Sequence, residues 1–357
     1  MVRRALPSIL SVVTSLVVCF IAIAITRGDL AVAVDAYREM FLGGIGNLRA
    51  WGESTSKAAL LVLTGLSVAV GFSVGLFNIG AQGQMLVGAI VAAVIGAQLA
   101  LPFGLHPLVC LLGAAVGGAL WGLIPAVLKL RRGVHEVIST IMLNWIAVSL
   151  IENWLVIGPL KAPTTGTVSM SGTAEILATA RLPRLLGDMS RLHAGFLIAL
   201  VLAVGVWLWL GRTTRGYETR AVGLGPEAAR TAGVPVTRRV YQAMALSGAL
   251  AGLAGAVLVL GTEYKFPATL GGQYGFDGIA IALIGQNHPL GVCASALLFG
   301  VLRAGGTRMQ LLGVHKSFPE LIQGLALLFV AGRLIWERAL QWRDRRREAA
   351  ALEVSRG

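Results

Sequence analysis

The sequence predicts an all-α, polytopic membrane protein with about eight to ten transmembrane segments, including broken or re-entrant half-helices. Of its 357 residues, 56% are hydrophobic and only 13% are charged, whereas an average soluble domain has about 25% charged residues. Apolar runs near the roughly 20 residues that a membrane span requires follow one another along most of the chain. We therefore expect a single transmembrane domain over residues 1–335 and a charged cytoplasmic tail over 336–357.

Ten apolar segments support this prediction. Two of them, 276–286 and 289–303, are short and meet at Asn287-His288-Pro289. Because proline lacks the backbone donor and disfavours helix in the residue before it, we predict two half-helices with a break there. In chain order, the segments are 8–26, 58–77, 84–101, 107–128, 136–157, 194–211, 240–261, 276–286, 289–303 and 318–334.

The distribution of basic residues predicts the orientation. A net charge of +13 could indicate a nucleic-acid partner, but Lys and Arg are concentrated in short segments between apolar runs. This is the positive-inside pattern of a protein embedded in lipid, and we expect no nucleic acid. With a cytoplasmic N-terminus, 18 of the 30 basic residues lie inside and both termini are cytoplasmic. Residues 158–193 then form an outer loop, and residues 212–239 form a cytoplasmic loop with six arginines.

The most informative stretch is a polar interruption at residues 72–89. Asn78, Gln82 and Gln84 lie there among four glycines, between two apolar segments. Unpaired amide and backbone groups cost several kcal/mol each in hydrocarbon, so the stretch should be buried in protein or line a watery cavity. Amides could also bond across a glycine-rich helix interface. Three amides in seven residues favour a discontinuous helix along a solute pathway. Asn144, inside another apolar segment, fits either interpretation.

A second interruption, residues 271–278, precedes an apolar half-helix. Asp277 is placed either as the N-cap of that helix or, with Phe276, at the mouth of the cavity that Asn78 lines. The two interruptions occupy comparable positions in the two halves of the chain. This similarity suggests an inverted repeat.

The cytoplasmic loop contains the segment Glu227-Ala-Ala-Arg-Thr-Ala-Gly233. Pro226 suits the first turn of a short helix, and Gly233 suits the residue that ends it. Such a helix either couples to a partner protein or is an ordinary surface helix.

The sequence offers no constellation for catalysis, metal binding or nucleotide binding. The segment Gly313-Val-His-Lys316-Ser317 lacks the glycine that a phosphate loop needs before its lysine, and His135-Glu136 lacks the second histidine of a zinc helix. We expect neither an enzyme nor a resident cofactor or metal. The alternative function is a stand-alone, ion-coupled secondary transporter, for which Asp277 and Glu152 are the candidate coupling carboxylates.

Five stretches in order resemble the signatures of a known group of transporters. The chain is similar over residues 55–330 to permease subunits of bacterial ABC importers of the nucleoside and simple-sugar branch, a branched-chain-type permease family. The stretches are Phe77–Ala89, Gly133–Trp145, Gly158–Pro163, Arg220 through Gly255, and Tyr274–Leu283. Two residues depart from the pattern: His135 stands where we expect Asn, and Gln82 where we expect Glu. The second departure leaves the solute open.

The resemblance implies a subunit of the bacterial cytoplasmic (inner) membrane without ATPase activity of its own. Its implied partners are cytoplasmic ATPase subunits that bind the ATP, a second homologous permease and an extracytoplasmic solute-binding lipoprotein. The implied ATPase-coupling residues are Glu227, Ala228, Ala229 and Gly233. The residues that we expect along the solute pathway are Phe77, Asn78, Gln82, Gln84, Asn144, Phe276 and Asp277.

Overall fold

The computed structural model describes residues 2–163, 172–270, 273–315 and 317–331. The described chain is helical, with only isolated β-bridges in its loops. Eight of the described helices are long and apolar enough to cross a membrane, which agrees with the predicted all-α polytopic fold. The predicted tail 336–357 and the last residues of the segment 318–334 lie outside the described residues.

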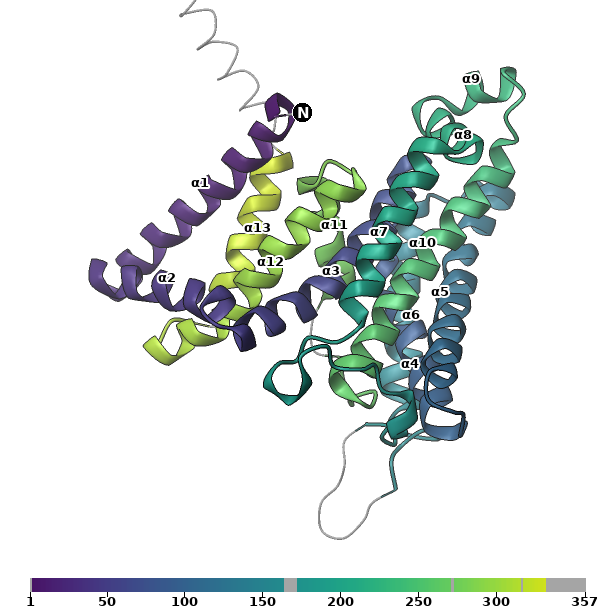
Figure 1. Ribbon diagram of the computed structural model, residues 1–357. Helices are drawn as coiled ribbons and strands as arrows, with labels where there is room; N and C mark the ends of the chain where they lie inside the picture. Colours follow the sequence, from purple (N-terminus) through teal and green to yellow (C-terminus); the bar gives the residue numbers. More distant parts are fainter. Residues whose placement is uncertain (1, 164–171, 271–272, 316, 332–357) are drawn as a thin grey trace, which may run out of the picture. The chain divides into compact units, whose positions relative to one another are not determined.

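The helices follow the predicted order closely (Figure 1). Their bounds are α1 Val2–Arg27, α2 Leu30–Ile45, α3 Leu48–Ser73, α4 Ala81–Gln98, α5 Leu105–Arg132, α6 Glu136–Leu150, α7 Gly195–Arg212, α8 Thr214–Leu224, α9 Pro226–Thr231, α10 Val236–Leu258, α11 Tyr274–Ile284, α12 Pro289–Met309 and α13 Phe318–Ala331. Short π-helical segments extend α6 over Ile151–Leu155 and α10 over Val259–Glu263.

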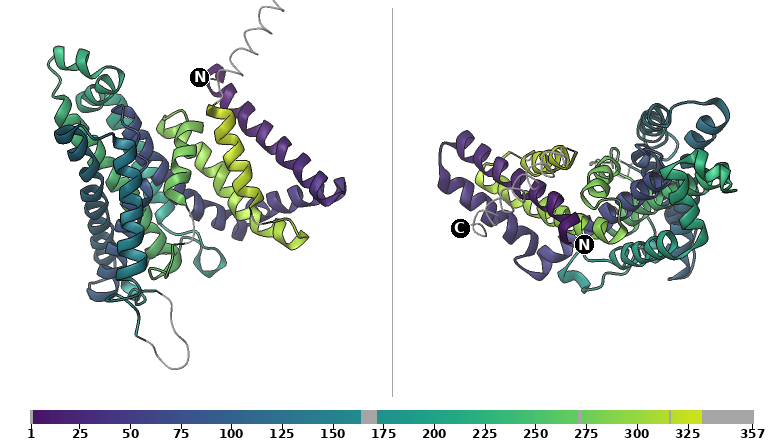
Figure 2. Two further views of the ribbon diagram at one scale, coloured as in Figure 1. Left: turned by 180° about the vertical axis from the view of Figure 1, so that it is seen from behind. Right: turned by 90° about the horizontal axis from the view of Figure 1, so that it is seen from above.

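The chain forms two compact units. The smaller unit combines Met1–Met40 with the chain from Gly306 onward, and the larger unit is Phe41–Gly305. In the smaller unit α1 packs against α13, and the Tyr37 hydroxyl donates a hydrogen bond to the Leu16 carbonyl. In the larger unit α10 packs against α3, α4 and α5, and these long helices run alongside one another (Figure 2). The single domain predicted over residues 1–335 stays a prediction.

Burial separates central helices from peripheral ones in the larger unit. The apolar windows of α3 and α10 are 89% and 78% buried, whereas those of α5, α6 and α7 are each 28% buried. The peripheral helices leave large apolar side chains exposed, among them Trp145 and Val201. Apolar exposed faces on helices of this length are expected where a protein meets lipid.

Glycines allow the central helices to pack backbone against backbone. A Cβ on Gly252 of α10 would lie 2.3 Å from the Ala114 carbonyl oxygen of α5, and one on Gly88 of α4 would lie 2.3 Å from the Gly252 Cα. Small residues permit this approach, and the packing replaces a hydrophobic driving force that is absent within lipid.

The predicted breaks are confirmed, with two corrections to the elements around them. The chain leaves helix between Ser73 and Ala81, and residues Gln286 and Asn287 take positive φ values just before α12. However, the segment predicted as a half-helix at 289–303 is wrong in length, because α12 and the turn after it extend to Leu312, long enough to span. Helix α2 was not predicted, because Asp35, Arg38 and Glu39 interrupt its apolar pattern.

The two ends of the larger unit differ in charge. Figure 1 shows α8 and α9, the helices of the predicted cytoplasmic loop, at the same end as the basic C-terminus of α5, Lys129–Arg132. The described parts of the predicted outer loop lie at the opposite end. This arrangement supports the positive-inside assignment, and the side of the membrane that each end faces stays a prediction.

Candidate functional site

Asn78 lies at the centre of a buried hydrogen-bond network in the break between α3 and α4. Its Nδ2 donates to Gln84 Oε1 at 2.9 Å and to Ser247 Oγ of α10 at 2.7 Å. Its Oδ1 accepts from Gly80 N at 3.0 Å and from Gln84 Nε2 at 3.1 Å. All four hydrogen-bonding positions of the amide are therefore used inside the protein.

The network continues from Asn78 to α3 through two serines. The Ser247 hydroxyl donates to the Ser67 carbonyl at 2.6 Å, and the two serine Oγ atoms lie 3.1 Å apart. Both serines are buried. A buried network whose members are all paired favours one arrangement. These bonds therefore hold the break between α3 and α4 against α3 and α10.

Asn144 of α6 holds the beginning of α4 in place. Its Nδ2 donates to the Ile79 carbonyl at 2.9 Å, and its Oδ1 accepts from Gly83 N at 2.8 Å. Gly83 is in the first turn of α4, where backbone N–H groups have no partner within the helix. Asn144 thus caps a helix from a neighbouring one, so interhelical bonding, one of its two predicted roles, is what this structure shows.

Gln82 connects the two predicted interruptions. Its Oε1 accepts a hydrogen bond from Gly275 N, in the first turn of α11, at 2.8 Å. A Cβ on Gly275 would lie 2.3 Å from the Gln82 Cα, so the N-terminal turns of α4 and α11 touch through their backbones. The structure therefore brings together the interruptions at 72–89 and 271–278.

Asp277 does not cap α11, and that interpretation was wrong. Gln273 occupies the N-cap position, and Asp277 lies within the helix, where its N–H donates to the Gln273 carbonyl. Its carboxylate instead pairs with Arg303 of α12 at 2.5 Å, with the two side chains only 13% and 15% exposed. The Arg303 guanidinium also lies over the Tyr274 ring, 4.9 Å from its centroid.

Further charges lie beside this pair. Lys57 Nζ of α3 donates to the Arg303 carbonyl at 3.3 Å and lies 3.5 Å from the Glu53 carboxylate. Arg191 of the outer loop lies 3.7 Å from the same carboxylate. The hydrogen bond from Lys57 to the Arg303 carbonyl thus joins two groups of paired charges, and charges at membrane depth are expected only where they are paired or face water.

The two predicted aromatic residues keep exposed surface. Phe77 is half-buried and packs edge-to-face on Phe72, with ring centroids 4.8 Å apart. Phe276 of α11 is 37% exposed. Glu152, the other candidate coupling carboxylate, accepts a hydrogen bond from Leu270 N at 2.9 Å and so fixes the chain before α11.

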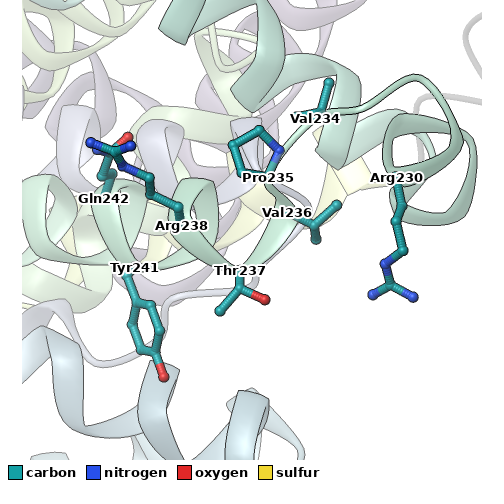
Figure 3. Close-up of a pocket in the computed structure, with 8 residues that line it drawn as sticks. All are labelled: Arg230, Val234, Pro235, Val236, Thr237, Arg238, Tyr241 and Gln242. Atoms are coloured by element: carbon teal, nitrogen blue, oxygen red, sulfur yellow. The ribbon is translucent and has the colours of Figure 1, made fainter.

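The predicted coupling segment forms a short helix, as expected. Pro226 is the first residue of α9, and Gly233 follows its end with φ of +81°. Glu227 and Ala228 are exposed, whereas Ala229 is buried and faces the protein. A shallow pocket lies between the end of α9 and the beginning of α10 (Figure 3). Its lining residues are Arg230, Val234, Pro235, Val236, Thr237, Arg238, Tyr241 and Gln242.

Several residues that position the site were not predicted from the sequence. Ser67, Ser247 and Arg303 occur singly in apolar segments, where no local pattern marks them, and Tyr274 lies in the interruption 271–278 but was not assigned a role. Of these residues, Arg303 could have been predicted to take part in a site, because an arginine in an apolar segment requires a partner. Among the described residues, no three His, Cys, Asp or Glu side chains are grouped to hold a metal ion.

Comparison with known proteins identifies the family. The family described as branched-chain amino acid transport system, permease component, matches residues 52–331, most of the chain. The protein belongs to this permease family. The resemblance of the sequence stretches is thereby confirmed, and the family and the eight apolar helices make the protein a multi-pass protein of the inner membrane.

Three relatives illustrate the range of this permease family. The chain is 39% identical over 302 residues to the guanosine ABC transporter permease protein NupP of Bacillus subtilis, covering 83% of this chain and 85% of the relative. It is 35% identical over 312 residues to the nucleoside ABC transporter permease protein NupB of Lactococcus lactis, covering 84% of each. It is 34% identical over 345 residues to the glucose ABC transporter permease protein TsgB13 of Haloferax volcanii, covering 92% and 89%. No solved structure matches the chain.

Proposed function

We propose that this permease is the membrane-spanning subunit of an ABC importer for nucleosides or related simple-sugar-type solutes. The observation that carries the proposal is the similarity, over most of both chains, to permeases of guanosine, nucleoside and glucose ABC transporters. The secondary-transporter alternative finds no support in the site. Asp277 is paired with Arg303, and the Glu152 carboxylate holds a backbone N–H.

The site favours an uncharged polar solute with a ring. The amides Asn78, Gln82 and Gln84 carry no charge, and the charges around α11 are paired with one another. Phe77 and Phe276 retain surface against which a base or sugar ring can stack. A nucleoside combines such a ring with hydroxyl groups, and the guanosine and nucleoside relatives make it the first solute to test.

In the proposal, four of the seven pathway residues line the pathway and the other three hold the lining in place. Phe77 precedes α4, Gln82 lies in the first turn of α4, and Phe276 and Asp277 lie in the first turn of α11, which touches that of α4; in the proposal these four residues form the lining. Asn78, Gln84 and Asn144 hold the broken backbone in place behind that lining, because their hydrogen bonds go to neighbouring helices. The paired buried groups give the lining a defined geometry.

The partners in the proposal are cytoplasmic ATPase subunits, a second permease and an extracytoplasmic solute-binding lipoprotein. ATP is bound and hydrolysed by the ATPase subunits, and this chain has no ATPase activity of its own. The exposed residues Glu227 and Ala228 contact the ATPase, Ala229 anchors α9 on the protein, and Gly233 shapes the end of α9.

A pull-down from native membranes in mild detergent tests the assembly. The tagged protein should recover a P-loop ATPase and a second permease by mass spectrometry. Reversing the exposed charge with Glu227→Lys should reduce ATPase recovery, whereas Glu175→Lys, an equally drastic change in the outer loop, should not. Recovery of the protein alone, or only with copies of itself, would refute the importer.

A further inference from the structure

Helix α8 touches the break between α3 and α4 through bare backbone. A Cβ on Gly223 of α8 would lie 2.4 Å from the Ser73 carbonyl oxygen and 3.0 Å from Gly75 N. In the other direction, a Cβ on Gly75 would lie 3.2 Å from the Gly223 Cα, and Gly75 itself has φ of +78°. The backbones of the two segments are in direct contact here, with no flexible side chain between them. A displacement of α8 is therefore passed directly to the break.

The same break leads to the half-helix α11 in three short steps. The turn at Gly75 continues to Asn78, whose amide is bonded in both directions to Gln84 on the first turns of α4. In the same turns, Gln82 accepts the hydrogen bond of Gly275 N on α11. Each step is either a covalent connection, a paired buried hydrogen bond or a backbone-to-backbone contact.

The other end of this chain of contacts is the predicted coupling helix. Gly225 alone separates α8 from α9, so the chain connects the two helices directly. Glu218 of α8 also pairs with the buried Arg239 of α10, at 2.5 Å, which connects α8 to α10.

We propose that the contact of Gly223 with the turn at Ser73–Gly75 is the mechanical link through which the cytoplasmic loop controls α11. In this inference, which rests on the proposed function, α8 and residues 73–80 move as one body. The movement shifts the beginning of α4, and Gln82 carries the shift to Gly275 and so to the lining of the pathway. Gly223, Gly75 and Gln82 are positioning residues, and none of them needs to touch ATP or the ATPase.

Steric separation of the two segments gives the first test. Gly223→Val places a branched side chain where the Ser73 carbonyl lies, whereas Gly211→Val, in α7, adds the same bulk where nothing lies within 4 Å. In the complete complex, Gly223→Val should keep its ATPase subunits and their hydrolysis while solute uptake falls by about tenfold or more. Gly211→Val should transport normally. Normal uptake per ATP hydrolysed in Gly223→Val would overturn the link.

Cross-linking provides a test that does not depend on the folding of that variant. Ser73 and Tyr217 line one shallow pocket between the break and α8. In a chain freed of Cys19, Cys110 and Cys293, cysteines at these two positions are joined with a short, cleavable bifunctional thiol reagent. Uptake should persist after joining, as it does with a monofunctional reagent. Loss of uptake that cleavage of the reagent restores would show that the two segments separate, and would overturn the proposal.

Different results would refute the proposed function and the mechanical link. If the unmodified protein recovers no ATPase, the proposed function is wrong. If the ATPase is recovered but either the valine variant or the joined protein behaves contrary to expectation, only the link is wrong.

Discussion

Asn78 illustrates how a polar side chain can be retained in the core of a membrane protein. An amide transferred from water without partners costs several kcal/mol, yet all four hydrogen bonds of Asn78 are made to groups that themselves needed partners. Asn78 therefore stabilises the break between α3 and α4, whose backbone would otherwise be exposed. Any function of Asn78 in the pathway depends on this structural role.

Asn78→Leu should abolish uptake and should also lower thermal stability. Gln84, Ser247 and Gly80 N each lose a partner, and a buried polar group left unpaired costs about 1–3 kcal/mol. Thermal unfolding in detergent measures the change. Ser247→Ala, which removes one bond to Asn78 and the bond to the Ser67 carbonyl but leaves the other bonds of Asn78 in place, should have a smaller effect. Equal stability of Asn78→Leu and the unmodified protein would show that the network contributes nothing.

The Asp277–Arg303 pair should behave as a coupled unit. Asp277→Asn leaves a largely buried guanidinium without its carboxylate, and the cost should fall somewhat below the roughly 3–5 kcal/mol of a fully buried pair. The double variant Asp277→Arg with Arg303→Asp should recover part of the stability that each single variant loses. A double-mutant cycle on the melting temperature measures the coupling. Strict additivity would exclude an energetic interaction between the two residues.

The sequence predicts residues of this kind unevenly. The amides around Asn78 were found because three of them occur within seven residues, beside glycines that cannot favour helix. Their partners were not found, because Ser247 and Arg303 are far from Asn78 and Asp277 in sequence, and only the fold brings them together. The N-cap role of Asp277 failed for a related reason: the N-cap of α11 is Gln273, four residues before Asp277, so α11 begins before its apolar pattern does.

Among the helices, the short helix α11 meets the beginning of α4 at the site where the solute pathway is predicted. The half-helix α11 packs against α3 and α4, and its N-terminal turn touches that of α4. The lengths of α11 and α9 were predictable, because proline and glycine mark their ends. The length of α12 was not, because Gly305 and Gly306 interrupt its apolar pattern without ending the helix.

The predicted outer loop, residues 158–193, contains a titratable side chain that contacts the beginning of α7 and the π-helical extension of α10. His193 is buried, its Nδ1 accepts from Gly195 N at 3.1 Å, and its Nε2 lies 3.4 Å from the Thr262 hydroxyl. Burial, with a smaller contribution from the positive charge of Arg184, lowers the pKa of His193 from 6.5 to about 4. The folded protein therefore favours the neutral ring, which alone can accept the Gly195 hydrogen bond.

Acidification should weaken these contacts of His193. Because the pKa of His193 is lower in the folded than in the unfolded chain, its contribution is complete above pH 6.5 and is lost as the pH falls towards 4. The loss amounts to at most roughly 3 kcal/mol. Melting temperatures between pH 4 and 8 measure it, and His193→Gln, which keeps an acceptor but does not titrate, should flatten the curve. The same pH dependence in both proteins would exclude His193 as the cause.

At the scale of the whole molecule, composition and charge predicted most of the architecture. Apolar length determines the number of candidate spans, and positive charge separates the two ends of the larger unit. Neither property predicts the division into two units, which depends on contacts between the first 40 residues and the chain after Gly306. Residue chemistry also does not distinguish a nucleoside from a sugar as the solute, because stacking surfaces and neutral amides suit both.

Transport by the reconstituted complex distinguishes an ATP-driven importer from an ion-coupled transporter. The protein is incorporated into liposomes with its co-purified permease and ATPase, and the solute-binding lipoprotein is added on the outer side. Radiolabelled guanosine should accumulate only when ATP is present on the ATPase side, and unlabelled nucleosides should compete better than glucose. Accumulation by this protein alone, following an ion gradient without ATP, would contradict the account.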